Sequence, residues 1–330
     1  MRRRDFMAGV VGTAFAVNPP VALSQRSDRI KRVGLLLEYV EGDPEAQARL
    51  AAFRDGLRAA GWSEGGNVVV DYRFGGGDRA LIPALAAELA ALSPDVILGS
   101  GAPVTAALQE ATRTIPIVFV QASDPVGAGL VPSLGRPGGN VTGFTNFEYT
   151  MVGKWLEALK EVAPKVGTVL MIQNPSNFGW PGYLKAMEIA APSLAVQFTA
   201  GGVRDAGEIE RTIAAFSSTP NAGMMVLPDT TTSVNRKLII RLAHQHRLPA
   251  VYPFRFFVTD GGLMCYGIDV LDVFRRAASY VDRILRGEKA GDLPIQAPTK
   301  FELVINRTTA TTLGLTIPTS LLARSDEVID

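Results

Sequence analysis

The sequence predicts an α/β protein made of two doubly wound lobes, each built around a parallel sheet. Short apolar runs alternate with longer segments that carry apolar residues at helical spacing, and this alternation is typical of strands separated by amphipathic helices. Because the runs are apolar throughout, we expect sheets that are covered by helices on both faces. The alternation occurs twice over 330 residues, a length that exceeds one ordinary domain.

The first half is expected to form strands at 33–37, 67–74, 95–98, 116–120 and 140–144, and helices at 45–61, 79–92 and 104–112. In the first of these helices, Ala46, Leu50, Phe53 and Leu57 recur at the spacing of one helix face. A junction rich in glycine and proline, residues 123–146, closes this half and rules out a continuous helix. We therefore predict an ordered loop between two strands there.

The second half restarts the same rhythm after a helix at 151–163. Strands are expected at 168–172, 196–199, 224–227, 250–252 and 262–266, and helices at 182–191, 207–216, 233–244 and 270–285. One more strand, 301–305, precedes a short helix that runs through Leu313. The terminal stretch after it is free to cross between the lobes, so the lobe that holds this tail is left open.

Composition and charge exclude several classes of function. The chain has 33 basic and 32 acidic residues, and residues 2–5 contribute +2 to the formal charge of +1, which leaves the remainder near −1. This balance gives no reason to expect a nucleic-acid partner. The single Cys265 excludes an internal disulfide. His244 and His246 lie two apart, do not share a helix face, and are interpreted as a solvated helix end, so we predict neither a metal site nor a cofactor.

Residues 1–24 have the organisation of an export signal. A basic head that includes Arg3, Arg4 and Phe6 precedes a short apolar body at 8–17, a break at 18–20 and a cleavage candidate at 22–24. The body is far shorter than the roughly 20 apolar residues of a spanning helix. The head resembles the twin-arginine export motif, so we expect a mature protein in the periplasm.

Candidate ligand contacts follow the expected strands, because ligands of open parallel sheets bind beyond the carboxyl ends of the strands. Polar, aromatic and glycine residues occur after most of the strands in both halves. The candidate ligand-binding residues are Glu38, Tyr39, Ser100, Gly101, Ala102, Gln121, Asp124, Asn146, Asn174, Asp229, Arg255 and Tyr266.

Several of these candidates have two interpretations. The segment 99–101 either offers amides and a helix N-terminus to a small anion or is an ordinary glycine-rich turn. Asp229 either pairs with a ligand ammonium or caps the next helix, and Asp124 either contacts ligand or stabilises a turn. Arg255 either meets a carboxylate or forms a surface ion pair. Four aromatic residues either form a wall of the site or belong to the core: Tyr39, Phe178, Trp180 and Tyr183.

The usual signatures of enzymes are missing from the sequence. No Gly-x-Ser-x-Gly surrounds Ser100, no Gly-x-Gly-x-x-Gly follows the first strand, and no phosphate-binding Gly-x-x-x-x-Gly-Lys-Ser/Thr occurs. Two histidines on one helix make a Ser/His or Cys/His pair hard to build. Cys265 lies inside an apolar strand and is expected to be an inert core thiol.

Longer motifs resemble a known family. The segment 124–143, Asp-Pro-Val-x-Ala-Gly-Leu-Val-x-Ser-Leu-x-Arg-Pro-Gly-Gly-Asn-Val-Thr-Gly, is similar to the hallmark of substrate-binding components of bacterial ABC importers that include the tryptophan/tyrosine type. Further segments that resemble this family are 248–253, 261–267, 298–306 and 313–318. The resemblance runs from about Lys31 to the end of the chain.

The resemblance implies a type I periplasmic-binding fold in which a three-strand hinge joins two lobes that close on a small ligand. Residues 29–147 and about 268–290 are expected to form the first lobe, and residues 148–267 and about 291–330 the second. The crossovers are expected at 145–147 and 266–269, with Thr145, Asn146, Phe147, Tyr266 and Gly267 as hinge residues. By the same resemblance, the favoured ligand contacts are Ser100, Asp124, Asn146, Asn174 and Asp229.

The functional hypothesis is an exported, monomeric receptor that captures an amino acid or an aromatic or carboxylic acid and delivers it to an ABC permease. Hinge closure would be driven by ligand contacts from both lobes. An alternative is a ligand-sensing partner of a membrane signalling receptor, and an enzyme on the same fold is disfavoured by the missing nucleophile and base.

Overall fold

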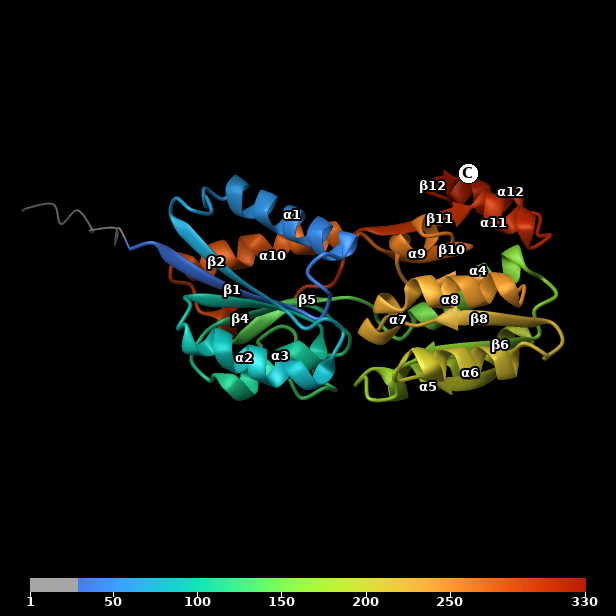
Figure 1. Ribbon diagram of the computed structural model, residues 1–330, viewed down its shortest axis with the longest axis horizontal. Coiled ribbons are helices and arrows are strands. Elements are labelled where there is room, and N and C mark those ends of the chain that lie inside the picture. Colours follow the sequence, from blue (N-terminus) through green and yellow to red (C-terminus); the bar gives the residue numbers. More distant parts are fainter. Residues whose placement is uncertain (1–28) are drawn as a thin grey trace, which may run out of the picture.

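The computed structural model describes residues 29–330 and shows two lobes side by side (Figure 1). In the first lobe, all neighbouring strands are parallel in the order β2-β1-β3-β4-β5. These strands are β1 (Lys31–Leu37), β2 (Val68–Phe74), β3 (Val96–Ser100), β4 (Ile117–Ala122) and β5 (Val141–Thr145). One sheet face packs on α1 (Pro44–Ala59) and α10 (Val270–Leu285), and the other on α2 (Ile82–Ala91) and α3 (Ala102–Ala111), with the short helix η1 (Arg79–Leu81) before α2. The doubly wound prediction is confirmed for this lobe.

The second lobe has a sheet in the order β12-β11-β10-β9-β8-β6-β7. Its strands are β6 (Thr168–Gln173), β7 (Gln197–Gly202), β8 (Ala222–Val226), β9 (Ala250–Tyr252), β10 (Met264–Ile268), β11 (Phe301–Asn306) and β12 (Glu327–Ile329). The helices of this lobe are α4 (Met151–Val162), α5 (Trp180–Ala190), η2 (Ala191–Leu194), α6 (Ala206–Phe216), α7 (Thr230–Val234), α8 (Arg236–Gln245), α9 (Arg255–Thr259), α11 (Arg307–Thr312) and α12 (Thr319–Arg324).

The second lobe differs from the sequence prediction in its strand directions and in its helices. Strands β10 and β11 are antiparallel, because the chain returns from the first lobe before it forms β11. The helix expected at 233–244 is divided at Asn235 into α7 and α8, and α9 was not expected. The terminal stretch, whose lobe the sequence left open, packs on the second lobe, since β12 pairs with β11 and Arg324 on α12 forms an ion pair with Glu161 on α4.

The chain passes between the lobes at three places. It leaves β5 after Thr145 toward α4, and it returns at Asp269 between β10 and α10, so Tyr266 and Gly267 lie in the second sheet just before that crossing. Residues up to Gln296 still contact the first lobe, because the Gln296 amide donates to Gly143 O at 3.0 Å and its carbonyl accepts from Thr145 N at 2.9 Å. The third crossing therefore lies at about 297–300, after the expected boundary at 290.

The glycine- and proline-rich junction is an ordered loop between β4 and β5, as the sequence predicts. Leu130 and Val131 are buried against the first lobe. Near the end of the junction, a Cβ placed on Gly143 would lie 2.1 Å from the carbonyl oxygen of Phe119 on β4, at a φ of +156°. Glycine is therefore required where this strand passes its neighbour.

Two helices of the first lobe that are far apart in the sequence, α1 and α10, pack closely against each other. Helix α10, which is formed after the second lobe, packs along α1, and the two lie side by side in Figure 1. A Cβ on Gly56 of α1 would lie 2.6 Å from the carbonyl oxygen of Arg275 and 2.7 Å from the Cβ of Ala278. The helices can approach this closely only because residue 56 has no side chain.

Replacing Gly56 by alanine should destabilise the protein by about 1 to 3 kcal/mol, because the added methyl group overpacks a contact with backbone. Gly153→Ala in α4 is the matched control, since a Cβ there meets no atom within 4 Å; its stability should be unchanged or up to about 1 kcal/mol higher. Urea unfolding measures both. Equal stability of the two variants would contradict the close crossing.

Candidate functional site

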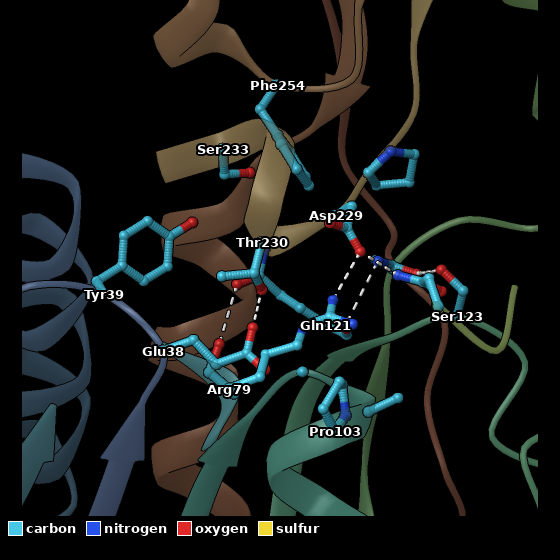
Figure 2. Close-up of a pocket in the computed structure, with 16 residues that line it drawn as sticks. Glu38, Tyr39, Arg79, Pro103, Gln121, Ser123, Asp229, Thr230, Ser233 and Phe254 are labelled. Carbon is cyan, nitrogen blue, oxygen red and sulfur yellow. Dashed lines mark hydrogen bonds and ion pairs between the residues drawn. The ribbon is translucent and has the colours of Figure 1, made fainter. Parts of the chain in front are cut away.

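A cleft lies between the lobes, where the carboxyl ends of strands from both sheets meet (Figure 2). The first lobe contributes Glu38, Tyr39, Arg79, Ser100, Gly101, Ala102, Pro103, Gln121, Ser123 and Asn146 to its lining. The second lobe contributes Asn177, Pro228, Asp229, Thr230, Ser233 and Phe254. Both lobes therefore present polar groups to one small space.

An ion pair crosses the cleft between Arg79 and Asp229. The Arg79 Nη2 atom lies 3.0 Å from Asp229 Oδ2, and the Asp229 side chain is fully buried. Asn177 Nδ2 donates to the same oxygen at 2.7 Å, while Asp229 Oδ1 accepts the Thr231 amide at 2.7 Å and so caps α7. One carboxylate thus both caps a helix and holds a cation from the opposite lobe.

Glu38 is buried at the end of β1, facing the second lobe. The Thr230 hydroxyl donates to Glu38 Oε2, and within the described chain Oε1 has no hydrogen-bond partner. Burial raises the pKa of Glu38 to about 8; the positive charge of Arg79 opposes this rise and the negative charge of Asp229 adds to it. Burial in this arrangement therefore favours the protonated form of Glu38.

The turn from β3 into α3 lies beneath the Glu38 carboxyl group. Gly101 has a φ of +95°, and a Cβ there would lie 3.7 Å from the carboxyl carbon of Glu38. Ser100 donates its hydroxyl to Gln121 Oε1 at 3.3 Å. The first amides of α3 and the Ser100 hydroxyl thus border the cleft, an arrangement that suits a small anion.

A second set of charges joins the lobes beside the cleft. Arg236 on α8 lies 3.1 Å from Asp43 Oδ2 of the first lobe and 2.8 Å from Asp260 of its own lobe, and its side chain is 7% exposed. Asp43 also caps α1 by accepting the Glu45 amide through Oδ1 at 2.8 Å. Asp43 and Asp229 therefore have the same double role.

Arg49 is buried near these contacts without equivalent partners. Its guanidinium carbon lies 4.4 Å from the ring centre of Tyr39 and 5.4 Å from that of Phe256 in the opposite lobe. Over residues 29–330, none of its three guanidinium nitrogens has a hydrogen-bond partner, and Glu45 lies 4.0 Å away. Burying this cation between the lobes carries a desolvation cost that the aromatic contacts offset only in part.

Four candidate residues lie outside the cleft lining. Asp124 has a left-handed φ of +43°, and its carboxylate accepts from the Gly127 amide at 2.8 Å and from the Tyr149 hydroxyl at 3.0 Å. These contacts agree with the interpretation that Asp124 stabilises a turn. Asn174 is buried behind the cleft wall, where Nδ2 donates to Thr231 Oγ1 at 3.0 Å.

The other two candidates lie near the hinge. Arg255 forms ion pairs with Glu302 and Glu327, as its ion-pair interpretation anticipates. Tyr266 is half-buried in β10, and its carbonyl accepts from Trp155 Nε1 at 2.6 Å. Of the four aromatic residues considered as a wall, Tyr39 lines the cleft, whereas Tyr183 is in the core, Trp180 packs against the core and Phe178 is 49% exposed.

Arg79 is the charged cleft residue that the sequence analysis missed. The candidate ligand contacts of the first half follow its other strands, whereas Arg79 follows β2, from which Gly75, Gly76, Gly77 and Asp78 separate it. That glycine run after a strand, followed by a charged residue, was the available signal. Ser233 and Phe254 also line the cleft.

Residues 35–329 match the model of the family described as ABC transporter substrate binding protein. The chain belongs to this family. Its members are binding proteins and not typically enzymes, and they deliver small molecules to membrane ABC permeases.

This substrate binding protein is similar to two solved structures and to one further relative in sequence. A conserved domain protein from Vibrio cholerae is 30% identical, with a TM-score of 0.85 over 91% of this chain and 100% of that chain. An ABC domain in complex with L-Trp from Streptococcus pneumonia is 25% identical, with a TM-score of 0.84 over 91% and 99%. The tyrosine-binding protein of Clostridioides difficile is 24% identical over 292 residues, which are 88% of this chain and 84% of that protein.

The arrangement of the lobes is that of a closed form. The ligand-free, open structure of a substrate binding protein from Clostridium difficile is also 25% identical over 91% of this chain, yet its TM-score is 0.67, below the 0.84 of the L-Trp complex. The free space in the cleft is about 50 Å³, whereas ligand pockets have about 300 to 1,000 Å³. Side chains from both lobes fill the cleft, so a ligand can enter only after the lobes separate.

Residues 29–330 contain neither a membrane-spanning helix nor a cluster of metal ligands. In that range no helix is long and apolar enough to cross a membrane. The same residues contain no group of three or more His, Cys, Asp and Glu side chains placed to hold a metal ion. Cys265 is buried in β10, and burial raises the pKa of its thiol.

Arg236→Met should shift the ligand-free protein toward an open form, because it removes charged hydrogen bonds worth about 1 to 3 kcal/mol. Small-angle X-ray scattering should give a larger radius of gyration for Arg236→Met than for the unchanged protein. The measurement is made at about pH 6, where Glu38 takes up a proton when the lobes close. The control is Arg241→Met on the same helix, since Arg241 is 62% exposed and pairs with Glu210 of its own lobe. An unchanged radius for Arg236→Met would show that this contact does not hold the lobes together.

Proposed function

We propose that this substrate binding protein captures a small zwitterionic ligand, an α-amino acid with an aromatic or other apolar side chain, and delivers it to an ABC permease. The observation that carries the proposal is the mixture of charges in one cleft: two acidic side chains, Glu38 and Asp229, face one guanidinium, that of Arg79. A zwitterion can replace the Arg79–Asp229 pair with one contact for each of its own charges.

The ammonium group of the ligand is assigned to Asp229. That carboxylate is fully buried, is held in place by Asn177 and the Thr231 amide, and faces the opposite lobe. A ligand ammonium that takes the place of the Arg79 guanidinium keeps the carboxylate neutralised, so the lobes can close around it without burying an unpaired charge.

The carboxylate of the ligand is assigned to Arg79, Ser100 and the first amides of α3. Arg79 is freed when the ligand ammonium replaces it at Asp229, and in the described chain its Nε is buried without a partner. The hydroxyl of Ser100 and the positive end of the α3 dipole lie on the same side of the cleft.

The side chain of the ligand is assigned to the aromatic part of the lining. Tyr39 from the first lobe and Phe254 from the second flank the polar groups (Figure 2), and aromatic rings recognise flat apolar groups. The relatives support this class of ligand, since one was solved with L-Trp and another is named a tyrosine-binding protein. The remaining proposed cleft contacts, Gly101, Ala102, Gln121 and Asn146, shape the first-lobe wall.

Export is part of the proposal and rests on residues 1–24, which lie outside the described residues. The basic head with Arg3, Arg4 and Phe6 directs the folded chain across the membrane, and the receptor works in the periplasm. Recovery of a chain that begins near Gln25 from the periplasmic fraction would support this part. A full-length chain confined to the cytoplasm would contradict it.

Asp229→Asn should weaken the binding of L-tryptophan or L-tyrosine by about 2 kcal/mol or more, about 30-fold, because a buried charge-assisted contact to the ammonium is lost. Asparagine still caps α7, so the fold should be retained. Asp205→Asn is the matched control, since Asp205 caps α6 and does not line the cleft. Calorimetry checks both variants, and equal affinity for Asp229→Asn and the unchanged protein would remove Asp229 from the site.

A further inference from the structure

The enclosure of Glu38 is completed by the second lobe. From the first lobe, Gly101 lies beneath its carboxyl group and Arg79 is the nearby cation. From the second lobe, Thr230 donates a hydroxyl to Oε2 and Asp229 contributes a negative charge. Glu38 is 2% exposed in this closed form, and separating the lobes would remove Thr230 and Asp229 and return the carboxyl group to water.

In the closed cleft without a ligand, no cation of the described chain is available to pair with Glu38. Arg79 directs its Nη2 atom to Asp229, which neutralises that carboxylate. An ionised Glu38 would then be a buried negative charge whose Oε1 has no partner among residues 29–330. Burial of this kind is costly, so an empty cleft closes with a proton on Glu38.

We propose that a proton and the protonated amine of the ligand compete for Glu38, so that this residue makes the cleft select amine-bearing ligands. The inference rests on the proposed function, because it takes this cleft as the ligand site. When the lobes close around an amine-bearing ligand, the ammonium that binds Asp229 also donates to the Glu38 carboxylate on the opposite side of the cleft, so Glu38 stays ionised and takes up no proton. When they close around a ligand without an amine, Glu38 must keep or take up a proton.

The direction of the pH dependence follows from the two states of Glu38. In water its pKa is near the ordinary value of 4.5, and in the closed cleft without a neighbouring ammonium burial raises the pKa to about 8. Closure without an ammonium therefore takes up a proton between these values and becomes less favourable as the pH rises. Closure around an ammonium leaves Glu38 ionised and does not incur this loss. The preference for an amine should thus increase with pH.

The test compares L-tryptophan with 3-indolepropionate, which has the same ring and carboxylate but no amine. Calorimetric Kd values at pH 5.5 and 7.5 should show the ratio of affinities rising by at least about tenfold in favour of L-tryptophan, because one proton separates the two complexes. In Glu38→Gln the ratio should be smaller and independent of pH. Glu88→Gln, on the exposed face of α2, should behave like the unchanged protein.

A ratio that stays constant in the unchanged protein, or that rises equally in Glu38→Gln, would overturn the inference while leaving L-tryptophan as a ligand. The measurement on the unchanged protein does not depend on whether the variant folds. If neither probe binds, the proposed ligand class fails. Scattering of the empty protein then tests Glu38 by itself: the radius of gyration should increase from pH 5 to 8.5 and stay small in Glu38→Gln. An equal response of the two proteins would overturn the role of Glu38.

Discussion

Closing the two lobes buries charged side chains, and each must meet an opposite charge or lose its own. Arg79 meets Asp229 and Arg236 meets Asp43, in both cases across the gap between the lobes. Asp229 also caps α7 and Asp43 also caps α1. Each carboxylate is therefore held in position by a contact within its own lobe. Charged side chains that are positioned by their own lobe thus form ion pairs with the other lobe when the two lobes close.

Without a ligand, two buried ionisable side chains in or beside the cleft have polar atoms that lack a hydrogen-bond partner within residues 29–330. Glu38 is neutralised only by a proton, and Arg49 is buried between Tyr39 and Phe256 with no hydrogen-bond partner in the described residues. Both costs oppose closure of an empty cleft. A ligand that supplies an ammonium to the carboxylates and a carboxylate to Arg79 removes part of that cost. Ligand capture and lobe closure are thus two aspects of the same charge balance.

The strand pattern predicted both lobes and much of the cleft, because apolar runs mark the strands and ligands gather at their carboxyl ends. Glu38, Ser100 and Asp229 were placed in this way. What the sequence could not give was the partner of each side chain: Arg255 pairs with Glu302 and Glu327, which are 47 and 72 residues away. Asp124 follows a strand, yet its φ of +43° directs it into the turn. The order of strands in the sheet, which brings the end of β2 and Arg79 to the cleft, was also beyond a pattern of apolar residues.

The most direct test of this account is the distance between the lobes as ligand is added. Fluorescent labels at Glu88→Cys in the first lobe and Arg211→Cys in the second are both on exposed positions, and the native Cys265 is buried and will not be labelled. Energy transfer should show the lobes moving together when L-tryptophan or L-tyrosine saturates the protein, with one ligand bound per chain. Saturable binding with no change in the distance between the labels would contradict capture by closure of the cleft.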